Sequence, residues 1–250
     1  MPKSTFHIFF NNEAMFNQSL RYLQIPKNIC DRSLKPRRLH SIVIIVKSGI
    51  YNFRNRQLLR DAYRGRVNDE NSEIVMVFSV GLPRKSGGRV FQRDGFVITL
   101  PGRAGDAVEY YQSRYLEVLT NLKLEDEVNH DLLIGDYEDT YYNLTLKMMH
   151  SFQWASISCV PQKPTFVFID DDFAFNMDKL RQVIGNRTES TKGQMAIGVV
   201  RRKSPTVRHG RAPGNDKWSL SKHEVPWPEL APYTSGQFYV FGYEIVEEIA

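Results

Sequence analysis

The chain has 250 residues, 42% of them hydrophobic and 12% aromatic, which is enough to bury one substantial core, so a single folded domain is expected. The formal net charge is +5, with lysines and arginines scattered or paired rather than alternating with aromatic residues, which argues against a nucleic-acid partner and favours an anionic small ligand. No apolar run is long enough to span a bilayer, and the short apolar patch near the start lacks the features of a signal peptide.

The first part of the chain differs from the rest. Residues 1–38 show no convincing hydrophobic period and end in a basic, proline-containing stretch. We therefore predict a stem or loosely packed N-terminal extension over 1–38 and a folded domain over 39–250. The chain has two cysteines, Cys30 and Cys159, too few for a disulfide scaffold or a zinc site. A disulfide between them and two free thiols are both compatible with this count.

Apolar patterns along the rest of the chain predict alternating strands and helices. Runs rich in β-branched and aromatic residues indicate strands, and apolar spacing of three to four residues indicates amphipathic helices. The predicted strands are residues 42–46, 73–81, 131–136, 165–170, 196–200 and 237–241, and the predicted helices are 54–64, 108–122, 142–149, one that begins at Asn176 and one that begins at Glu244. This alternation predicts an α/β sheet with helices on both faces. A long loop or lid is expected over 201–228, which is rich in Arg, Lys, Gly, Pro and Ser.

Three arginines recur at four-residue spacing on the helix predicted over 54–64. Arg56, Arg60 and Arg64 would line one face of that helix. A solvated helix face is one interpretation of this pattern. Like charges at this spacing destabilise a helix, however, so an anion bound against them is the alternative.

Three consecutive carboxylates, Asp170, Asp171 and Asp172, follow the apolar run 165–169. The run has the composition of a buried strand, and Asn176 fits the N-cap of a following helix. The acids are therefore expected on a strand-to-helix turn, at the end of the sheet where open α/β folds bind ligands. Adjacent carboxylates repel one another, so Mg²⁺ or Mn²⁺ is a natural compensation, and a solvated turn is the alternative.

The stretch from Glu125 to Lys147 combines an acidic cluster, Asp-Leu-Leu, Asp-Tyr and then Asp-Thr-Tyr-Tyr-Asn-Leu-Thr-Leu-Lys. It resembles a long and specific block of the β-1,3-galactosyltransferases, glycosyltransferase family 31, which also holds β-1,3-N-acetylglucosaminyltransferases and resembles the fringe enzymes. Three further blocks resemble that family in the same order. They are Arg56 to Tyr63, Trp154 with Cys159 before the three acids, and Trp227-Pro228 with residues 232–239. The resemblance covers about residues 40–250.

This resemblance implies a GT-A nucleotide-sugar transferase fold with a central, mostly parallel sheet and helices on both faces. It implies transfer of galactose or N-acetylglucosamine from a UDP-sugar to an acceptor sugar hydroxyl, in β-1,3 linkage with inversion, and a dependence on Mn²⁺ or Mg²⁺. The partners are then a UDP-sugar donor and a glycan acceptor on a glycoprotein or glycolipid. Residence in the Golgi membrane as a type II protein with a lumenal catalytic domain is implied in the same way, through an anchor expected outside this chain.

The site expected from these motifs contains a metal ion held by Asp170 and Asp172. The residues expected to bind the nucleotide sugar are Arg56, Arg60, Asp136, Asp139, Lys147, Asp170 and Asp171. A metal held there would neutralise the charge that develops on the diphosphate leaving group.

Two pairs among these residues have alternative roles. Guanidinium groups suit phosphate oxygens, so Arg56 and Arg60 would bind the diphosphate or brace its pocket. Asp136 and Asp139 would meet uracil or ribose, or else cap the helix that begins near Tyr141. For each pair, the sequence leaves both roles open.

The chain also departs from the family pattern. Ala62 and Tyr63 replace the usual Thr-Trp, and Phe168 stands where lysine is common. The family's Glu-Asp-Val-type block, whose Asp is taken as the catalytic base, is not reached before Ala250, so no catalytic residue is assigned. The acids near the expected acceptor side are Glu224, Glu229 and Glu244, and none is at the family's base position. The domain is therefore expected to lack its C-terminal part and to be an incomplete catalyst, with a catalytically inactive transferase-like binding protein as the alternative function.

Overall fold

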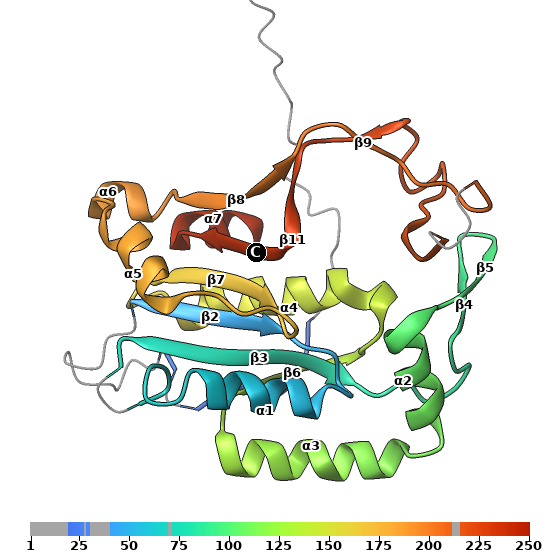
Figure 1. Cartoon of the computed structure of the whole chain (residues 1–250), viewed down its shortest axis with the longest axis horizontal. Coiled ribbons are helices and arrows are strands. Elements are labelled where there is room, and N and C mark those ends of the chain that lie inside the picture. The colour runs from blue at the N-terminus through green and yellow to red at the C-terminus, as the bar shows by residue number, and fades with distance from the viewer. Residues whose placement is uncertain (1–19, 28, 31–40, 70–71, 212–215) are drawn as a thin grey trace, which may run out of the picture.

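A seven-stranded sheet forms the centre of the molecule (Figure 1). The computed structural model describes residues 20–27, 29–30, 41–69, 72–211 and 216–250. In spatial order the strands are β1 (Tyr22–Gln24), β6 (Leu132–Glu138), β3 (Ile74–Leu82), β2 (Ile42–Lys47), β7 (Thr165–Asp170), β11 (Tyr233–Phe241) and β8 (Ala196–Arg201). The four central strands, β6, β3, β2 and β7, are parallel, and β1 and β11 run antiparallel to their neighbours. The sheet is therefore mostly parallel, and each of the six predicted strands is confirmed.

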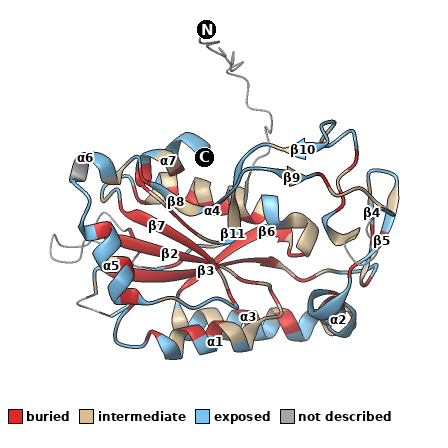
Figure 2. Ribbon diagram, turned by 45° about the horizontal axis from the view of Figure 1, so that its top comes forward, coloured by how far each residue is buried: buried red, intermediate tan, exposed pale blue. Residues whose placement is uncertain are grey.

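Strand β2 lies at the middle of the sheet because nearly all of its side chains are apolar and can be covered on both faces. Ile42, Ile44 and Val46 belong to the hydrophobic cluster on one face, and Val43 and Ile45 to the cluster on the other. All five are at most 3% exposed. Figure 2 shows the same concentration of buried residues along the central strands.

Helices cover both faces of the sheet, as predicted (Figures 1 and 2). On one face lie α1 (Phe53–Ala62), α3 (Tyr115–Asn129) and α5 (Met177–Gly185), and on the other lie α4 (Leu144–Ser158), which follows the short helix η2 (Tyr141–Asn143), and α7 (Tyr243–Ile249). Leu59, Val118 and Leu180 from the first set pack in one cluster, whereas Trp154 and Tyr243 pack in the other. The short helix α6 (Glu189–Lys192) lies between α5 and β8.

The prediction of one helix over 108–122 is wrong, because the segment forms two helices. Helix α2 (Gly102–Gln112) ends before α3 begins at Tyr115, and the Arg114 backbone N–H donates to the Tyr111 carbonyl at 2.9 Å. Ser113 keeps a helical backbone, but Arg114 leaves the helical region, with φ −112° and ψ 26°. Tyr111 and Tyr115 keep a four-residue spacing across the break, so the periodicity of the sequence does not reveal it.

The connection between β3 and α2 contains a hairpin that was not predicted. Strands β4 (Val90–Arg93) and β5 (Phe96–Thr99) pair antiparallel. Asp94 and Gly95 join them, both with positive φ, of 43° and 84°. Asp-Gly favours such a two-residue turn, because glycine adopts positive φ without strain and aspartate tolerates it. After Arg201, which ends β8, the described part of 201–228 holds only β9 (Ser204–Pro205), which pairs with β10 (Glu229–Leu230), and the short helix η3 (Asp216–Trp218), as expected for a long loop.

Part of the predicted N-terminal extension contacts the sheet. Strand β1 pairs with β6, and the Tyr22 hydroxyl donates to the His150 carbonyl at 2.9 Å. Cys30 and Cys159 form a disulfide, which resolves the alternatives left open by the cysteine count. Residues 1–19, 28 and 31–38 of the extension lie outside the described residues. Within the described part of the chain, no helix has both the length and the apolar character needed to cross a bilayer.

Candidate functional site

The three consecutive acids follow the carboxyl end of β7, as predicted. In the parallel ladder, Asp170 lies opposite Lys47 of β2, and Lys47 lies opposite Ser79 of β3. The Asn176 side chain caps α5 by accepting from the Lys179 backbone N–H at 2.9 Å. The acids therefore lie on a strand-to-helix turn at the edge where an open α/β sheet binds its ligands.

The three acids have different surroundings. Asp171 is 8% exposed and accepts hydrogen bonds from the loop between β2 and α1. Asp170 is 38% exposed at its side chain and pairs with the Lys47 ammonium at 2.6 Å. Asp172 is 53% exposed and pairs with Arg103 of α2 at 3.1 Å. Asp170 and Asp172 therefore present carboxylate oxygens to solvent, whereas Asp171 points inward.

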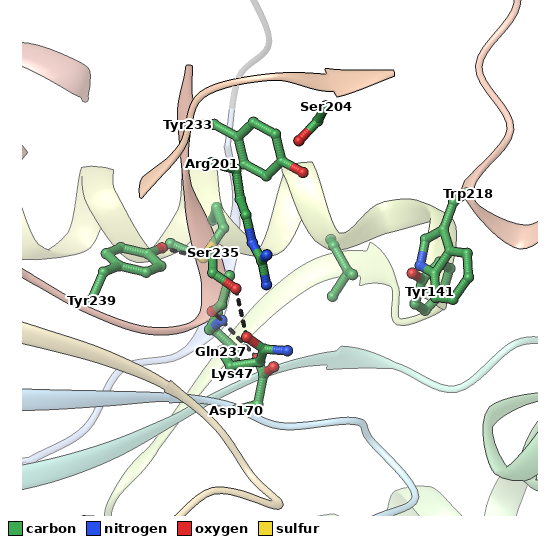
Figure 3. Close-up of a pocket in the computed structure, with 13 residues that line it drawn as sticks. Lys47, Tyr141, Asp170, Arg201, Ser204, Trp218, Tyr233, Ser235, Gln237 and Tyr239 are labelled. Carbon is green, nitrogen blue, oxygen red and sulfur yellow. Dashed lines mark hydrogen bonds and ion pairs between the residues drawn. The ribbon is translucent and has the colours of Figure 1, made fainter. Parts of the chain in front are cut away.

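A cavity of about 620 Å³ opens beside this turn (Figure 3). Its described lining residues are Lys47, Tyr141, Leu144, Met148, Asp170, Arg201, Ser204, Trp218, Tyr233, Ser235, Gly236, Gln237 and Tyr239. Figure 3 shows Lys47, Asp170 and Gln237 together at one end, with Arg201 and Tyr233 reaching in from paired positions on β8 and β11. Trp218 and Tyr141 lie side by side at another wall. We call this space the large cavity; among its described lining residues Asp170 is the one carboxylate.

A second space of about 140 Å³, the small cavity, adjoins it. The two share Lys47, Tyr141 and Leu144. The other lining residues of the small cavity are Gly49, Ile50, Tyr51, Asn52, Leu100, Ala104, Ala107, Val108, Asp139, Thr140 and Lys147. Tyr51 stacks on Tyr111 with ring centroids 4.9 Å apart, and burial raises the pKa of Tyr51, which keeps its hydroxyl protonated. The small cavity is thus a mainly apolar slot with a buried ion pair in its wall.

Arg56 and Arg60 lie inside the protein, in a cluster with Glu125 of α3 and Asp131. The Arg56 side chain is fully buried and bonds Glu125 through Nε and Nη2, at 2.8 and 2.7 Å. Arg60 pairs with Glu125 at 2.7 Å and with both oxygens of Asp131 at 2.8 Å. We call these four residues the arginine cluster. The solvated-face interpretation is wrong for Arg56 and Arg60 and correct for Arg64, whose side chain is 79% exposed.

Opposing effects act on the carboxylate at the centre of this cluster. Burial alone would raise the pKa of Glu125, but the hydrogen bonds and charges of Arg56 and Arg60 outweigh it and lower that pKa. Glu125 therefore stays ionised, and the cluster balances two guanidinium groups against two carboxylates. Its donors and acceptors face one another, so they hold α1 against α3 and β6.

Asp139 and Lys147 form a second buried ion pair, at 2.9 Å, with side chains 4% and 2% exposed. Asp139 also accepts from the Gly81 backbone N–H at 2.9 Å, and the Lys147 ammonium donates to the Ser48 carbonyl. Both residues line the small cavity. Asp136 lies apart, pairs with Arg21 at 3.6 Å and lines neither cavity.

The capping alternative for Asp136 and Asp139 is wrong. The N-cap positions of η2 and α4 are Thr140 and Asn143, and neither has a side-chain cap hydrogen bond. The Asn143 side chain instead donates backward to the Glu138 carbonyl at 2.8 Å. The Asp139 carboxylate is already held by Lys147 and a backbone N–H, which explains why it does not cap the helix.

The three glutamates considered near the acceptor side do not line the large cavity. Glu224 pairs with Arg93 of the β4–β5 hairpin at 2.7 Å. Glu229 lies on β10, and Glu244 lines a separate cavity near the start of β2 and β7, at the other edge of the sheet. The structure therefore brings none of them to Asp170.

Sequence reasoning assigned no role to Lys47 or Arg201, which both line the large cavity. Lys47 ends the central strand, and its ammonium lies 5.5 Å from the centroid of the Tyr239 ring. Burial, reinforced by the charge of Asp170, raises the pKa of Tyr239 well above its usual range, so this phenol stays neutral beside the ion pair. Position alone was the available signal for Lys47, because it directly follows a buried β-branched run. Arg201 carried no comparable signal, since it begins a loop rich in basic residues.

The acidic turn has oxygen donors that fit a hard divalent cation. Within the described residues, no group of three or more His, Cys, Asp and Glu side chains is arranged to hold a metal ion. Mg²⁺-type sites commonly use one or two carboxylates and complete the shell with water and substrate phosphates. Asp170 and Asp172, both partly exposed, are two carboxylates of the kind that such a site uses.

The chain matches a known family over its second half and beyond. The profile of the galactosyltransferase family matches residues 116–250, which is more than half of the chain and includes β6, α4, β7 and β11. The matched segment contains the acidic turn and most walls of the large cavity.

Individual relatives agree with the family match. The chain is 29% identical to beta-1,3-galactosyltransferase 5 of Mus musculus over 126 residues, which cover 50% of this chain and 39% of that protein. It is 30% identical to the Homo sapiens protein of the same name over 125 residues, 50% of this chain and 38% of the relative. It is 24% identical to lactosylceramide 1,3-N-acetyl-beta-D-glucosaminyltransferase of Homo sapiens over 212 residues, 83% of this chain and 47% of the relative. The chain thus spans less than half of the length of each of these relatives.

Proposed function

Because this chain belongs to the galactosyltransferase family, we propose that it is a β-1,3-hexosyltransferase. It moves galactose or N-acetylglucosamine from a UDP-sugar to a sugar hydroxyl on a glycoprotein or glycolipid, with inversion at the anomeric carbon. The names of its relatives support this choice, since they include a β-1,3-galactosyltransferase and a 1,3-N-acetylglucosaminyltransferase. The mostly parallel sheet with helices on both faces is compatible with the GT-A architecture that we propose for it.

The single observation that carries the proposal is the pairing of Lys47 with Asp170 at the shared edge of two cavities. A donor of this class has a flat base, a diphosphate and a sugar. The small cavity offers an apolar slot beside Tyr51 for part of the nucleoside, and the large cavity offers volume and hydroxyl groups for the sugars. The diphosphate then passes Lys47, whose ammonium is a point charge suited to phosphate oxygens.

Asp170 and Asp172 are the residues that would hold Mn²⁺ or Mg²⁺. When bound, the ion would supply positive charge to the diphosphate as the bond to the sugar breaks. In the structure, Lys47 pairs with Asp170 and Arg103 pairs with Asp172, so each carboxylate already has a cationic partner. Lys47 would be released from Asp170 toward the phosphates, which places its charge where the leaving group becomes more negative.

We assign Arg56, Arg60, Asp139 and Lys147 the bracing role that the sequence left open for the arginines. Their charged atoms are paired with one another inside the protein. Lys147 and Arg56 also donate to backbone carbonyls of residues 48–50, the loop that forms one wall of the small cavity. They would shape the donor site while staying paired with one another, and they would not bind its phosphates.

We propose residence in the lumen of the Golgi, with a type II membrane anchor. The Cys30–Cys159 disulfide supports an oxidising compartment, because such bonds are rare in proteins of the cytosol.

Calorimetry with UDP and Mn²⁺, followed by transfer assays with UDP-galactose and UDP-N-acetylglucosamine, tests the proposal. We expect metal-dependent UDP binding that Asp172→Asn weakens by at least tenfold. Asp178→Asn is the control, since Asp178 is an exposed acid on α5 that also pairs with an arginine, Arg66, and lines neither cavity. Metal-dependent binding without transfer from either donor would favour the inactive binding protein, and absence of UDP binding would refute both functions.

A further inference from the structure

We propose that Asp171 and Ser48 form a buried contact that positions the acidic turn before any ligand binds, and that Asp171 is a positioning residue rather than a ligand. This inference rests on the proposed function, because it concerns how Asp170 and Asp172 are held for the donor and metal. It departs from the expectation that Asp171 binds the nucleotide sugar.

Protein donors take up most of the acceptor capacity of Asp171. Its Oδ2 accepts from the Ser48 hydroxyl at 2.7 Å, the Gly49 backbone N–H at 3.1 Å and the Asn52 side chain at 2.9 Å. Its Oδ1 accepts from the Asn55 side chain at 3.2 Å. A carboxylate offers about two lone-pair sites on each oxygen, so three donors saturate Oδ2 and Oδ1 keeps one site. Because Asp171 is only 8% exposed, that site has little access to a metal or a phosphate-bound water.

Ser48 links this carboxylate to the arginine cluster. It is 0% exposed, and its hydroxyl accepts from Arg56 Nη1 at 3.0 Å while donating to Asp171. Arg56 Nη1 also donates to the Gly49 carbonyl at 2.8 Å. A hydroxyl between a guanidinium and a carboxylate is polarised in one direction, so a fixed chain runs from Arg56 through Ser48 to Asp171.

The position of this series of hydrogen bonds indicates which residues it holds in place. Lys47 and Asp170 are the last paired residues of β2 and β7, and Ser48 and Asp171 are the residues directly after them. The contact therefore extends the strand pairing beyond the sheet and connects the turn to the loop 48–52. Two residues of this loop, Gly49 and Asn52, contribute to both the contact and the wall of the small cavity. Losing it would free Asp170 and Asp172 to move relative to Lys47 and the small cavity.

The test compares Ser48→Ala, Asp171→Asn and the milder Asn55→Ala, with Asp172→Asn as the variant of a proposed ligand. Calorimetry measures UDP affinity as a function of Mn²⁺ concentration, at a temperature where denaturation curves show each variant to be folded. We expect Ser48→Ala and Asp171→Asn to weaken UDP–Mn²⁺ binding five- to fiftyfold while leaving it saturable. Asn55→Ala should have a smaller effect in the same direction, and Ser48→Cys should recover part of the affinity lost in Ser48→Ala.

Amide hydrogen exchange gives a readout that does not depend on the proposed function. In the wild type, the Gly49 N–H should be protected by Asp171, and Ser48→Ala and Asp171→Asn should each accelerate its exchange at least tenfold, whereas Asp172→Asn should not. Unchanged Gly49 exchange in both variants would overturn the contact, whether or not UDP binds. UDP–Mn²⁺ affinity in folded Ser48→Ala and Asp171→Asn within twofold of wild type would overturn the positioning role. Complete loss of Mn²⁺ binding in Asp171→Asn with normal Gly49 exchange would instead make Asp171 a ligand.

Discussion

The arginine cluster and the acidic turn use the same kinds of side chain for different purposes. In the cluster, Arg56 and Glu125 are at most 9% exposed and each charge is met by an opposite one. In the turn, Asp170 and Asp172 each have one cationic partner and remain 38% and 53% exposed. Charges whose partners surround them fix the shape of the protein, whereas charges with spare, solvated oxygens are available to a ligand. Exposure and the number of partners therefore separate the two roles better than residue type does.

Removing Arg56 should produce the largest effect that this comparison predicts. Arg56→Ala leaves Glu125 buried with Arg60 alone, and breaking such a buried pair costs about 3–5 kcal/mol. Chemical denaturation measures the loss. Arg64→Ala on the same helix is the control, and its exposed side chain should change stability by less than about 0.5 kcal/mol. Equal losses in the two variants would contradict the distinction between cluster and surface.

In the Asp139–Lys147 pair, removing one charge should destabilise the protein more than removing both. Lys147→Met should cost about 3 kcal/mol, because Asp139 remains buried and keeps only the Gly81 N–H as a partner. Adding Asp139→Asn removes the uncompensated charge and keeps an acceptor for Gly81, so the double variant should be more stable than Lys147→Met. Denaturation of the four-member mutant cycle checks this, and simple additivity of the two losses would count against it.

Asp170 should respond differently from these buried pairs. Asp170→Asn should cost about 1–2 kcal/mol of stability, because Asp170 itself is 38% exposed and the Lys47 ammonium, only 8% exposed, keeps the Gly236 carbonyl as an acceptor. The same variant should lower UDP–Mn²⁺ affinity by about 1.5–3 kcal/mol, the range for hydrogen bonds to charged groups. Thermal denaturation and calorimetry on one protein sample separate the two quantities. A large stability loss with normal affinity would move Asp170 into the structural group.

The smallest effect concerns pH. The pKa of Glu125 is lowered in the folded protein, so its contribution to stability is complete above the pKa of the unfolded chain and is lost as the pH falls through the folded value. Denaturation free energies measured from pH 7 downward should therefore begin to fall near pH ~4.5, close to the usual glutamate pKa. Glu125→Gln should be less stable at pH 7 and should show a shallower fall. An identical pH slope in both proteins would assign the acid sensitivity to other carboxylates.

The sequence was sufficient to predict the parallel strands and the acidic turn, because local composition determines both. Residues 42–46 and 165–169 are apolar enough to be covered on both faces. Charged carboxylates do not fit that buried environment, so the acids after Ile169 are expected at the end of the strand. The burial and the partners of Arg56 were not predictable in the same way. Its partner Glu125 lies 69 residues along the chain, so only the packing of α3 beside α1 shows that the arginine is neutralised internally.

The two cavities illustrate the same limit. Their walls come from β2, α2, η2, β8, β11 and the loop after β9, which no local pattern brings together. The hairpin at Asp94-Gly95 was different, because its turn signal was present in the sequence. The acidic turn was predictable because its signal lies in one short stretch of sequence. The site around it was not, because its residues come together only when the chain folds.

The wall that the two cavities share has a consequence for inhibitor chemistry. Lys47, Tyr141 and Leu144 border both spaces. At about 140 Å³, the small cavity lies below the range of about 300–1,000 Å³ typical of sites for drug-sized molecules. A fragment confined to it would therefore bind weakly, and so would a polar fragment in the open large cavity. Joining the two across Lys47 turns the second contact into an intramolecular one, so the linker across this wall should determine potency more than either fragment does.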